Sequence, residues 1–363
     1  MGKRVVIAGG GTGGHIFPAI AIANALKKID GSIEILFIGA KGRMEMEKVP
    51  QAGYKIEGLD IAGYNRSSLI KNIGLPIKLL KSFLQVRTIF KKFKPDAAIG
   101  VGGYSSFPVL RFAQARRIKT FIHESNSFAG KSNIMLGRKA TKVFTGTDGM
   151  EKFFPKEKII ITGNPVRAAI ADASVTRSEG LNFFSMDPGK KTVLIVGGSL
   201  GAKSINEAVD NGLESLLKAG LQIIWQTGKP YAAKAKERTM GKKSVWVNEF
   251  ITQMEYAYAA ADIVVARAGA ITVTELCVAK KSVLFVPYPF AAENHQMVNA
   301  MQLEKKNAAL IVKDKEAMQK LVFMTIELSM DEGKQNELKK NISALAQRNA
   351  DMKIAEEVIK SLK

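Results

Sequence analysis

The feature that most constrains this fold is the stretch RVVIAGGGTGGHIFP at residues 4–18, where an apolar run breaks into glycines and a helical pattern follows. Residues 4–8 are short and β-branched, which is typical of a buried parallel strand. The glycines let backbone N–H groups approach a ligand closely. The helical pattern from Ile16 onward predicts a helix N-terminus at the end of the loop, with His15 beside it. Such a junction stabilises a bound phosphate, because the first N–H groups of a helix lack partners and its dipole favours an anion.

Two familiar phosphate motifs fit this loop poorly. Gly9, Gly11 and Gly14 have the GxGxxG spacing of a dinucleotide fold, but the strand expected at 33–38 is followed by Gly-Ala-Lys and not by an acid. No Lys-Ser or Lys-Thr pair follows the glycines, as a P-loop requires. Taken alone, the loop is also consistent with a tight turn that binds nothing.

Strand and helix patterns alternate along the 363 residues, which is long enough for two domains. The expected strands lie at 4–8, 33–38, 55–59, 97–101, 120–123 and 142–145, and then at 192–196, 222–226, 244–247, 263–266 and 283–286. This alternation predicts βαβ units and parallel sheets covered on both faces. The sequence therefore predicts an α/β fold of two Rossmann-like, doubly wound domains, at 1–163 and 164–345.

Composition narrows the cellular setting. No stretch reaches about 18 uninterrupted apolar residues, as a membrane span requires, and the chain enters a strand at once, which leaves no room for a signal peptide. The single cysteine, Cys277, argues against a disulfide framework and fits a reducing cytosol. Because it lies in the apolar helical run TVTELCVA, we expect it in the core.

The charge predicts an anionic partner: 54 Lys and Arg face 33 Asp and Glu, a formal net charge of +21. No acidic residue occurs at 64–95, and a helix expected at 76–93 carries two apolar faces. One holds Leu79, Phe83, Val86, Phe90 and Phe93; the other holds Ile77, Leu80 and Leu84 among Lys81, Arg87 and Lys91. A second apolar face ringed by cations predicts contact with an anionic membrane surface. The alternatives are a helix packed on both sides or a solvated basic face; nucleic acid is disfavoured, because no binding motif is present.

Further junctions follow other strands of the first half. AAIGVGGYSSFP at 97–108 is a second glycine loop, and TFIHESNSFAG at 120–130 brings His123, Glu124 and Asn126 to a strand end. Because ligands of open α/β sheets bind at the carboxyl ends of the strands, we expect these loops at one edge. His123 and Glu124 are either a general base with its orienting carboxylate or a structural polar cluster.

The second half begins in the same way. TVLIVGGSLG at 192–201 places Ser199 where its hydroxyl can bind a phosphate oxygen, and ARAGAITVTE at 266–275 predicts a helix that starts near Gly269. Glu275 on that helix suits the two hydroxyls of a ribose. The amides in VPYPFAAENHQMVNA at 286–300 suit sugar hydroxyls. No cluster has zinc-site spacing and no DxD motif is present, so we expect chemistry on a phosphate-bearing substrate without a metal or other cofactor.

In order and spacing, these motifs resemble those of the MurG family: GGGTGGHIFP, GVGGYSSFP, HESNSFAG, GNPVR, GGSLGA and ARAGAITVTE, followed by the HQ and NA of 294–300. MurG enzymes are GT-B glycosyltransferases that move N-acetylglucosamine (GlcNAc) from UDP-GlcNAc onto undecaprenyl-pyrophosphoryl-MurNAc-pentapeptide in peptidoglycan synthesis. The resemblance implies two domains facing a cleft, with a C-terminal helix at about 346–363 joining the first domain. It also implies a peripheral location on the cytoplasmic face of the cell membrane, resting on the surface formed by Ile77, Leu80, Lys81, Leu84, Arg87 and Lys91.

The resemblance further implies a role for each motif. The residues implied to bind UDP-GlcNAc are Thr12, Gly13, Gly14, Asn126, Arg167, Ser199, the backbone of Ile251, Ala270, Ile271, Thr272, Val273, Thr274, Glu275, Gln296 and Asn299. Those implied to bind the acceptor pyrophosphate are Gly11, Gly102, Gly103, Tyr104 and Ser105.

The expected reaction is an inverting transfer, in which the C4 hydroxyl of MurNAc attacks the anomeric carbon while a general base takes its proton. His15 is the first candidate for this base, and His123 with Glu124 is the second. Helix N-termini would stabilise the departing UDP. The alternatives are another UDP-sugar transferase, a UDP-GlcNAc epimerase of the same fold, or a catalytically silent scaffold.

Overall fold

The computed structural model describes residues 2–61, 74–172, 174–291 and 294–362. The chain divides into two compact units, each described here by itself: residues 1–166 together with 348–363, and residues 167–347. The sequence placed the boundaries at 163/164 and 345/346.

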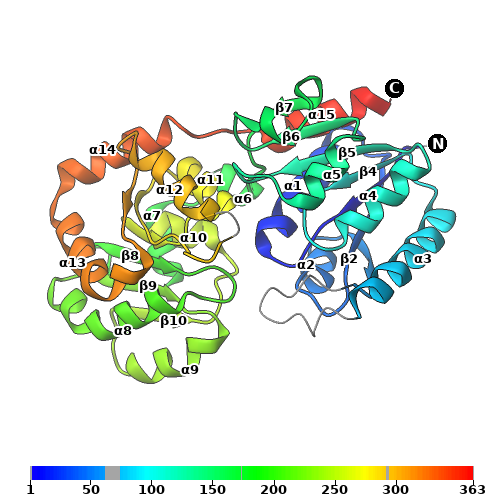
Figure 1. Ribbon diagram of the computed structural model, residues 1–363. Helices are drawn as coiled ribbons and strands as arrows, with labels where there is room; N and C mark the ends of the chain where they lie inside the picture. The colour runs from blue at the N-terminus through cyan, green and yellow to red at the C-terminus, as the bar shows by residue number, and fades with distance from the viewer. Residues whose placement is uncertain (1, 62–73, 173, 292–293, 363) are drawn as a thin grey trace. The chain divides into compact units, whose positions relative to one another are not determined.

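The first unit contains one sheet of seven strands in the order β3-β2-β1-β4-β5-β6-β7, and all of its pairings are parallel (Figure 1). The strands are β1 (Arg4–Ala8), β2 (Glu34–Ala40), β3 (Lys55–Leu59), β4 (Ala97–Gly100), β5 (Lys119–Glu124), β6 (Lys142–Thr145) and β7 (Ile159–Ile161). The α-helices are α1 (Gly13–Ile29), α2 (Glu45–Gln51), α3 (Leu75–Phe93), α4 (Ser106–Ala115) and α5 (Lys131–Gly137), with 3₁₀ turns η2 (Met150–Lys152) and η3 (Lys156–Lys158).

The chain order reverses between β1 and β4, and this reversal positions the site. Val5 of β1 lies in register with Ile35 of β2 on one side and with Ala97 of β4 on the other. The connections that leave β1 and β4 therefore diverge to opposite faces, which opens a crevice at the carboxyl ends of the strands. Both glycine loops of this unit lie at that edge.

The second unit has a six-stranded parallel sheet in the order β10-β9-β8-β11-β12-β13. Its strands are β8 (Thr192–Val196), β9 (Gln222–Gln226), β10 (Val245–Asn248), β11 (Ile263–Ala266), β12 (Ser282–Phe285) and β13 (Leu310–Ile311). Its helices are α6 (Ala168–Ala171), α7 (Arg177–Phe183), α8 (Lys203–Lys218), α9 (Lys229–Arg238), α10 (Met254–Ala260), α11 (Ala270–Ala279), α12 (His295–Glu304), η5 (Asp314–Glu316), α13 (Ala317–Met330) and α14 (Glu332–Ser343). Two doubly wound parallel sheets confirm the predicted fold class.

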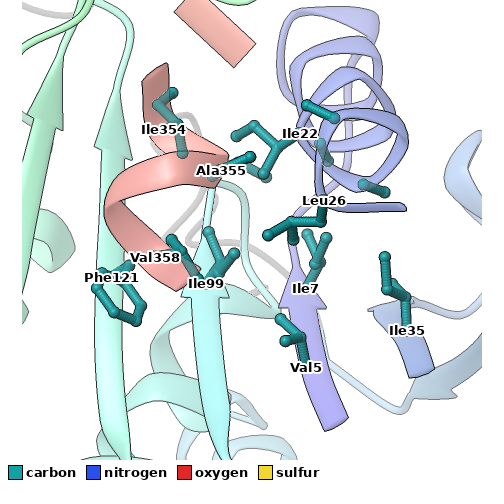
Figure 2. Packing of buried hydrophobic residues seen from close by; sticks show 14 of the residues in the cluster. Val5, Ile7, Ile22, Leu26, Ile35, Ile99, Phe121, Ile354, Ala355 and Val358 are labelled. Carbon is teal, nitrogen blue, oxygen red and sulfur yellow. The ribbon is translucent and has the colours of Figure 1, made fainter. Parts of the chain in front are cut away.

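The last helix, α15 (Ala350–Leu362), belongs to the first unit although it follows the whole second unit in the chain. Ile354, Ala355 and Val358 are fully buried and pack with Ile22 and Leu26 of α1 over the middle of the sheet (Figure 2). Covering the sheet core in this way removes apolar side chains from water, which stabilises the unit by about 25 cal/mol per Å² buried.

Several element boundaries differ from those expected. The edge strands β7 and β13 were not predicted, because strands of three and two residues carry little periodicity. β2 continues through Ala40, and α1 begins at Gly13, so His15 lies in the first turn of the helix and not in the loop. Because α1 starts this early, the N–H groups of its first turn lie within the glycine-rich stretch.

Candidate functional site

A buried carboxylate is hydrogen-bonded to the β1–α1 loop. Glu45, at the start of α2, is 1% exposed and accepts hydrogen bonds from the N–H groups of Gly11 (2.8 Å) and Ala40 (3.0 Å). A Cβ on Gly10 would lie 2.1 Å from a Glu45 carboxylate oxygen. A side chain at position 10 would therefore displace this carboxylate from the loop. The Gly11 amide, expected to bind the acceptor pyrophosphate, already donates to Glu45.

The β4–α4 loop packs against the β1–α1 loop backbone to backbone. A Cβ on Gly103, whose φ is +88°, would lie 2.4 Å from the Gly10 carbonyl oxygen. Ser106, which the sequence analysis did not single out, bridges the two loops by donating to the carbonyls of Ala8 (2.8 Å) and Gly102 (2.9 Å). Tyr104 is 45% exposed, whereas the hydroxyl of Ser105 is buried and turned inward. The assignment of Ser105 to the acceptor pyrophosphate stays a prediction.

His15 is held at the point where these loops meet. Its half-buried imidazole is hydrogen-bonded through Nδ1 to the Gly10 carbonyl oxygen at 3.1 Å. Because that carbonyl can only accept, Nδ1 carries the proton and Nε2 is the basic nitrogen. Burial lowers the pKa of His15, while the Gly10 hydrogen bond and the charges of Glu124 and Glu45 oppose that shift. The structure thus provides a neutral imidazole whose protonated form two carboxylates stabilise.

Gly102 gives His15 its space. A Cβ on Gly102, at φ +96°, would lie 2.7 Å from Nε2 and from Cδ2 of the ring. The amides of Gly13 and Gly14 belong to the first turn of α1, where helical geometry provides no acceptor. Thr12, the N-cap residue, is exposed. Thr12, Gly13, Gly14 and His15 therefore come together at one helix end.

His123 and Glu124 do not form a base and its orienting carboxylate. As neighbours on β5 they point to opposite faces of the strand. Glu124 accepts from the Asn126 amide and side chain (3.1 and 3.3 Å), the Gly130 amide (3.1 Å) and Asn133 (2.8 Å), so it shapes the loop after β5. Burial lowers the pKa of His123 to about 4, and His123 is only 1% exposed. The structural reading of this pair, left open by the sequence, fits these contacts.

In the second unit, the β8–α8 loop is held by a neutral amide. The Gln226 side chain at the end of β9 donates to the carbonyls of Gly198 (3.0 Å) and Glu249 (2.9 Å). Gly201 and Gly228, both at positive φ, pack backbone to backbone, since a Cβ on Gly201 would lie 1.9 Å from the Thr227 carbonyl oxygen. Ser199 is half-buried in this loop. Ile251, expected to contact uracil through its backbone, has a side chain that is 3% exposed.

The N-terminus of α11 offers three amides. Gly269 is the N-cap residue, and the first intrahelical bond runs from the Val273 amide to the Gly269 carbonyl (2.9 Å). The amides of Ala270, Ile271 and Thr272 therefore have no acceptor within the helix. Val273 and Thr274 lie beyond this group, and the Thr274 hydroxyl donates to the Ala270 carbonyl (2.9 Å). The predicted contact of residues 270–274 with UDP-GlcNAc stays a prediction, in which the amides of the first three residues are the ones without an acceptor in the helix.

Glu275, on the same helix, is 2% exposed and engaged on both oxygens. Arg167 Nε lies 3.1 Å from Oε1, and the Tyr258 hydroxyl donates to Oε2 at 3.1 Å. Burial raises the pKa of Glu275, and Arg167 and Tyr258 act against that rise. The sequence did not indicate Tyr258 on α10 as a site residue, because a tyrosine in an apolar run cannot be distinguished from an ordinary core residue.

The Arg267 side chain links the loops that follow β11 and β12. Arg267 donates to the Val286 carbonyl (2.8 Å) and to Asp314, and lies over the Tyr288 ring (5.4 Å). The side-chain oxygen of Gln296 accepts from the Tyr288 amide (2.9 Å). Asn299 donates to the Ala268 carbonyl (3.1 Å). Of the two expected sugar-binding amides, Asn299 thus lies beside the α11 N-terminus, and Gln296 lies against the loop after β12. Glu293, from the same motif, lies outside the described residues.

Helix α3 has the two apolar faces expected of it. Val86 and Phe90 are buried, whereas Ile77, Leu80 and Leu84 are 73%, 65% and 57% exposed. Lys81 pairs with Asp60 at 3.0 Å, and Lys41 pairs with the same carboxylate at 2.9 Å. Hydrogen bonds from Lys41 and Lys81 lower the pKa of Asp60 to about 2. Arg87 and Lys91 are exposed, while Arg66 and Lys71 lie outside the described residues.

Three further findings limit what the described residues can do. None of the described helices is both long enough and apolar enough to span a membrane. Within the same residues, no three His, Cys, Asp or Glu side chains gather as metal ligands. Cys277 is buried, as expected, and burial raises the pKa of its thiol to about 12.

Each unit therefore presents glycine loops and helix N-termini at the carboxyl edge of a doubly wound sheet. The second unit adds a carboxylate and amides beside its phosphate-type junction. This combination defines a two-domain α/β protein of the nucleotide-sugar-binding class.

Comparison with known proteins narrows this class. The chain matches the glycosyltransferase family 28 N-terminal domain over residues 5–145 and the family 28 C-terminal domain over residues 192–358. The UDP-N-acetylglucosamine–N-acetylmuramyl-(pentapeptide) pyrophosphoryl-undecaprenol N-acetylglucosamine transferase of Parabacteroides distasonis is 46% identical over 98% of both chains. The protein of the same name from Phocaeicola vulgatus is 48% identical over 98% of this chain and 96% of its own. The crystal structure of Acinetobacter baumannii MurG is 29% identical, covers 99% of both chains and has a TM-score of 0.75. The chain belongs to glycosyltransferase family 28 and, within it, to the MurG family of hexosyltransferases.

Proposed function

We propose that this protein transfers N-acetylglucosamine from UDP-GlcNAc to the C4 hydroxyl of MurNAc in undecaprenyl-pyrophosphoryl-MurNAc-pentapeptide. One observation carries the proposal: relatives of that name match the chain at 46–48% identity over 98% of its length. The likeness covers every motif described above.

The second unit holds the donor in this proposal. The free amides of Ala270, Ile271 and Thr272 and the dipole of α11 bind the diphosphate, with Ser199 contributing a hydroxyl. Glu275 accepts the ribose hydroxyls, and Gln296 and Asn299 bind the sugar. As the bond to the anomeric carbon breaks, negative charge develops on the UDP oxygen, and oriented amides stabilise it without reorganising.

The first unit supplies the base. His15 Nε2 accepts the proton of the attacking hydroxyl, and Glu124 and Glu45 stabilise the imidazolium that forms. His123 is a poorer candidate, because its side chain is only 1% exposed and burial lowers its pKa to about 4. The β4–α4 loop, through Gly102, Gly103, Tyr104 and Ser105, binds the acceptor pyrophosphate.

The exposed face of α3 rests on the membrane that contains the acceptor lipid. Ile77, Leu80 and Leu84 supply apolar contact, and Arg87 and Lys91 supply charge for anionic headgroups. Peripheral attachment through this face would place the protein on the cytoplasmic side, where UDP-sugars are found. Lys81, already paired with Asp60, contributes less charge to this surface than the sequence implies.

A radiolabel assay tests the proposal. Purified protein receives UDP-GlcNAc labelled in the sugar and a short-chain analogue of the lipid-linked MurNAc-pentapeptide, with EDTA present. We expect label in the lipid fraction. Label that stays in nucleotide form while UDP-GlcNAc still binds would overturn the acceptor assignment, and conversion of the free nucleotide sugar would identify an epimerase.

The membrane surface has its own test. We expect the triple variant Ile77→Ser, Leu80→Ser and Leu84→Ser to lose sedimentation with vesicles of phosphatidylglycerol and to keep UDP binding. Phe323→Ser, on α13 in the second unit and 61% exposed, is the matched control. If the triple variant sediments like the wild type, α3 is not the membrane contact.

A further inference from the structure

We propose that Tyr258 is a positioning residue of the donor site, which holds the Glu275 carboxylate in the orientation that accepts both ribose hydroxyls of the nucleotide. The inference rests on the proposed function, because it assumes that the second unit binds a uridine diphosphate sugar. Tyr258 makes no direct contact with the ligand in this proposal and acts through Glu275.

The two oxygens of Glu275 are held by partners of different accessibility. Tyr258 is 3% exposed, and its hydroxyl donates to Oε2 from within the packed helix α10. Arg167 Nε lies 3.1 Å from Oε1, and its side chain is 22% exposed at the first residue of the unit. Arg167 Nε and Glu275 Oε1 are themselves buried and form no hydrogen bond with each other, unlike the Tyr258 hydroxyl and Oε2. We therefore expect the Tyr258 bond to persist when a ligand binds and the Arg167 ion pair to be the contact that the ligand replaces.

Carboxylate chemistry allows this exchange. An ionised carboxylate has about four acceptor positions, so Oε2 can keep the Tyr258 bond and still accept a ribose hydroxyl. Oε1 accepts the other hydroxyl when Arg167 moves away from it. Arg167 can then turn toward the diphosphate. Without Tyr258, the side chain of Glu275 would lose the contact that fixes its orientation.

The hydroxyl also keeps the carboxylate ionised. Burial raises the pKa of Glu275, the nearby Glu255 raises it further, and Arg167 and Tyr258 lower it. Burial and the Glu275 charge raise the pKa of Tyr258 well above its ordinary value, so the phenol stays protonated and acts as a donor. Removal of the hydroxyl would leave Arg167 as the remaining group of this set that opposes protonation of Glu275.

A matched pair of variants tests the role. Tyr258→Phe removes only the hydroxyl. Tyr256→Phe removes a hydroxyl from the same helix, where the Tyr256 ring packs against Phe183 at 4.7 Å. Each protein is titrated with UDP and with 2′,3′-dideoxy-UDP, which lacks both ribose hydroxyls. Because bound ligand stabilises the folded unit, purification in UDP followed by dialysis keeps Tyr258→Phe measurable if it is less stable.

We expect the wild type and Tyr256→Phe to bind UDP at least about tenfold more tightly than the dideoxy nucleotide, as hydrogen bonds to a charged group imply. In Tyr258→Phe this preference should shrink by about fivefold or more, with the affinity for the dideoxy nucleotide unchanged. UDP affinity of Tyr258→Phe should also begin to fall at a higher pH on acidification, because the pKa of Glu275 rises. In turnover, KM for UDP-GlcNAc should rise with little change in kcat.

Equal weakening of both nucleotides, or an unchanged preference with an unchanged pH profile, would overturn the positioning role and leave Tyr258 as a packing residue. The proposed function fails in a different way: the wild type itself would not bind UDP, or would not prefer it to the dideoxy nucleotide. In that case the inference falls together with the donor site on which it rests.

Discussion

The leading glycine loops of the two units are alike in backbone packing, but a charged carboxylate holds the first and a neutral amide holds the second. In both, a glycine packs on the backbone of a neighbouring loop, Gly10 against Gly103 in the first unit and Gly201 against Gly228 in the second. The brace beneath the first loop is the buried carboxylate of Glu45, which accepts from the Gly11 amide. The brace beneath the second is the Gln226 amide, which donates to the Gly198 carbonyl.

This difference determines which loop is prepared for an anion. A carboxylate brace consumes a backbone donor and places a negative charge under the loop, whereas an amide brace consumes a carbonyl and leaves the donors free. The second unit is therefore better suited to the diphosphate of the donor. In the first unit the same carboxylate stabilises a protonated His15, which suits a unit that removes a proton.

The largest expected effect tests whether the first unit removes the proton while the second unit binds the nucleotide. We expect His15→Ala to lower kcat by about 10²- to 10⁴-fold, because it removes the general base, and to leave the Kd of UDP unchanged. Steady-state transfer assays and calorimetric titration with UDP measure the two quantities. If His15→Ala kept near-normal kcat while His123→Ala abolished transfer, the base would be His123 and the first loop would serve binding alone.

The next effect concerns stability. Ile354→Ala in α15 should destabilise the first unit by about 2–5 kcal/mol, because the side chain is fully buried against α1 and the sheet. Leu338→Ala, equally buried in α14, should destabilise the second unit instead. Calorimetric melts with and without UDP assign the transitions, since the nucleotide should raise the midpoint of the second unit only. A loss of UDP affinity in Ile354→Ala would contradict this independence.

Much of the fold was predictable from the sequence, because continuous β-branched apolar runs mark the buried parallel strands and helical spacing of apolar residues marks the amphipathic helices. The motifs also located the site: the glycine loops, His15 and the α11 start all lie at strand ends. The edge strands β7 and β13 were missed because two or three residues carry no period.

The braces were not predictable, because they depend on contacts between segments far apart in the chain. Nothing in GRMEMEKV marks Glu45 as the residue that accepts from the Gly11 amide. Likewise, the sequence shows Ser105 and Ser106 as adjacent hydroxyls, but only the fold turns the first inward and aims the second at two carbonyls. Side-chain direction at a helix start is set by packing and not by residue type.

A smaller effect compares the braces directly. Glu45→Gln keeps the shape but leaves a buried amide N–H group facing a backbone donor, so we expect a loss of about 1–3 kcal/mol in the stability of the first unit with UDP affinity unchanged. Gln226→Leu removes one donor from each of the Gly198 and Glu249 carbonyls, which keep the amides of Gly201 and Gly228 as donors, so we expect a smaller loss of stability in the second unit. Here UDP affinity should fall as well, because the loop that binds phosphate relaxes. Equal effects of both variants on UDP binding would contradict the proposal that only the loop held by Gln226 binds UDP.

The smallest expected effect is a shift in pH dependence. Since His15 must be neutral to act as a base and burial lowers its pKa, kcat/KM should decline on acidification only below pH 6.5, the ordinary value for a histidine. Glu45 raises the pKa of His15, so Glu45→Gln should move this acid limb to still lower pH, whereas Gln226→Leu should not move it. Transfer rates between pH 5 and 8 at low acceptor concentration measure the limb. An acid limb that moves upward in Glu45→Gln would show that the carboxylate does not act on the imidazolium, and the electrostatic contrast between the two loops would then concern stability alone.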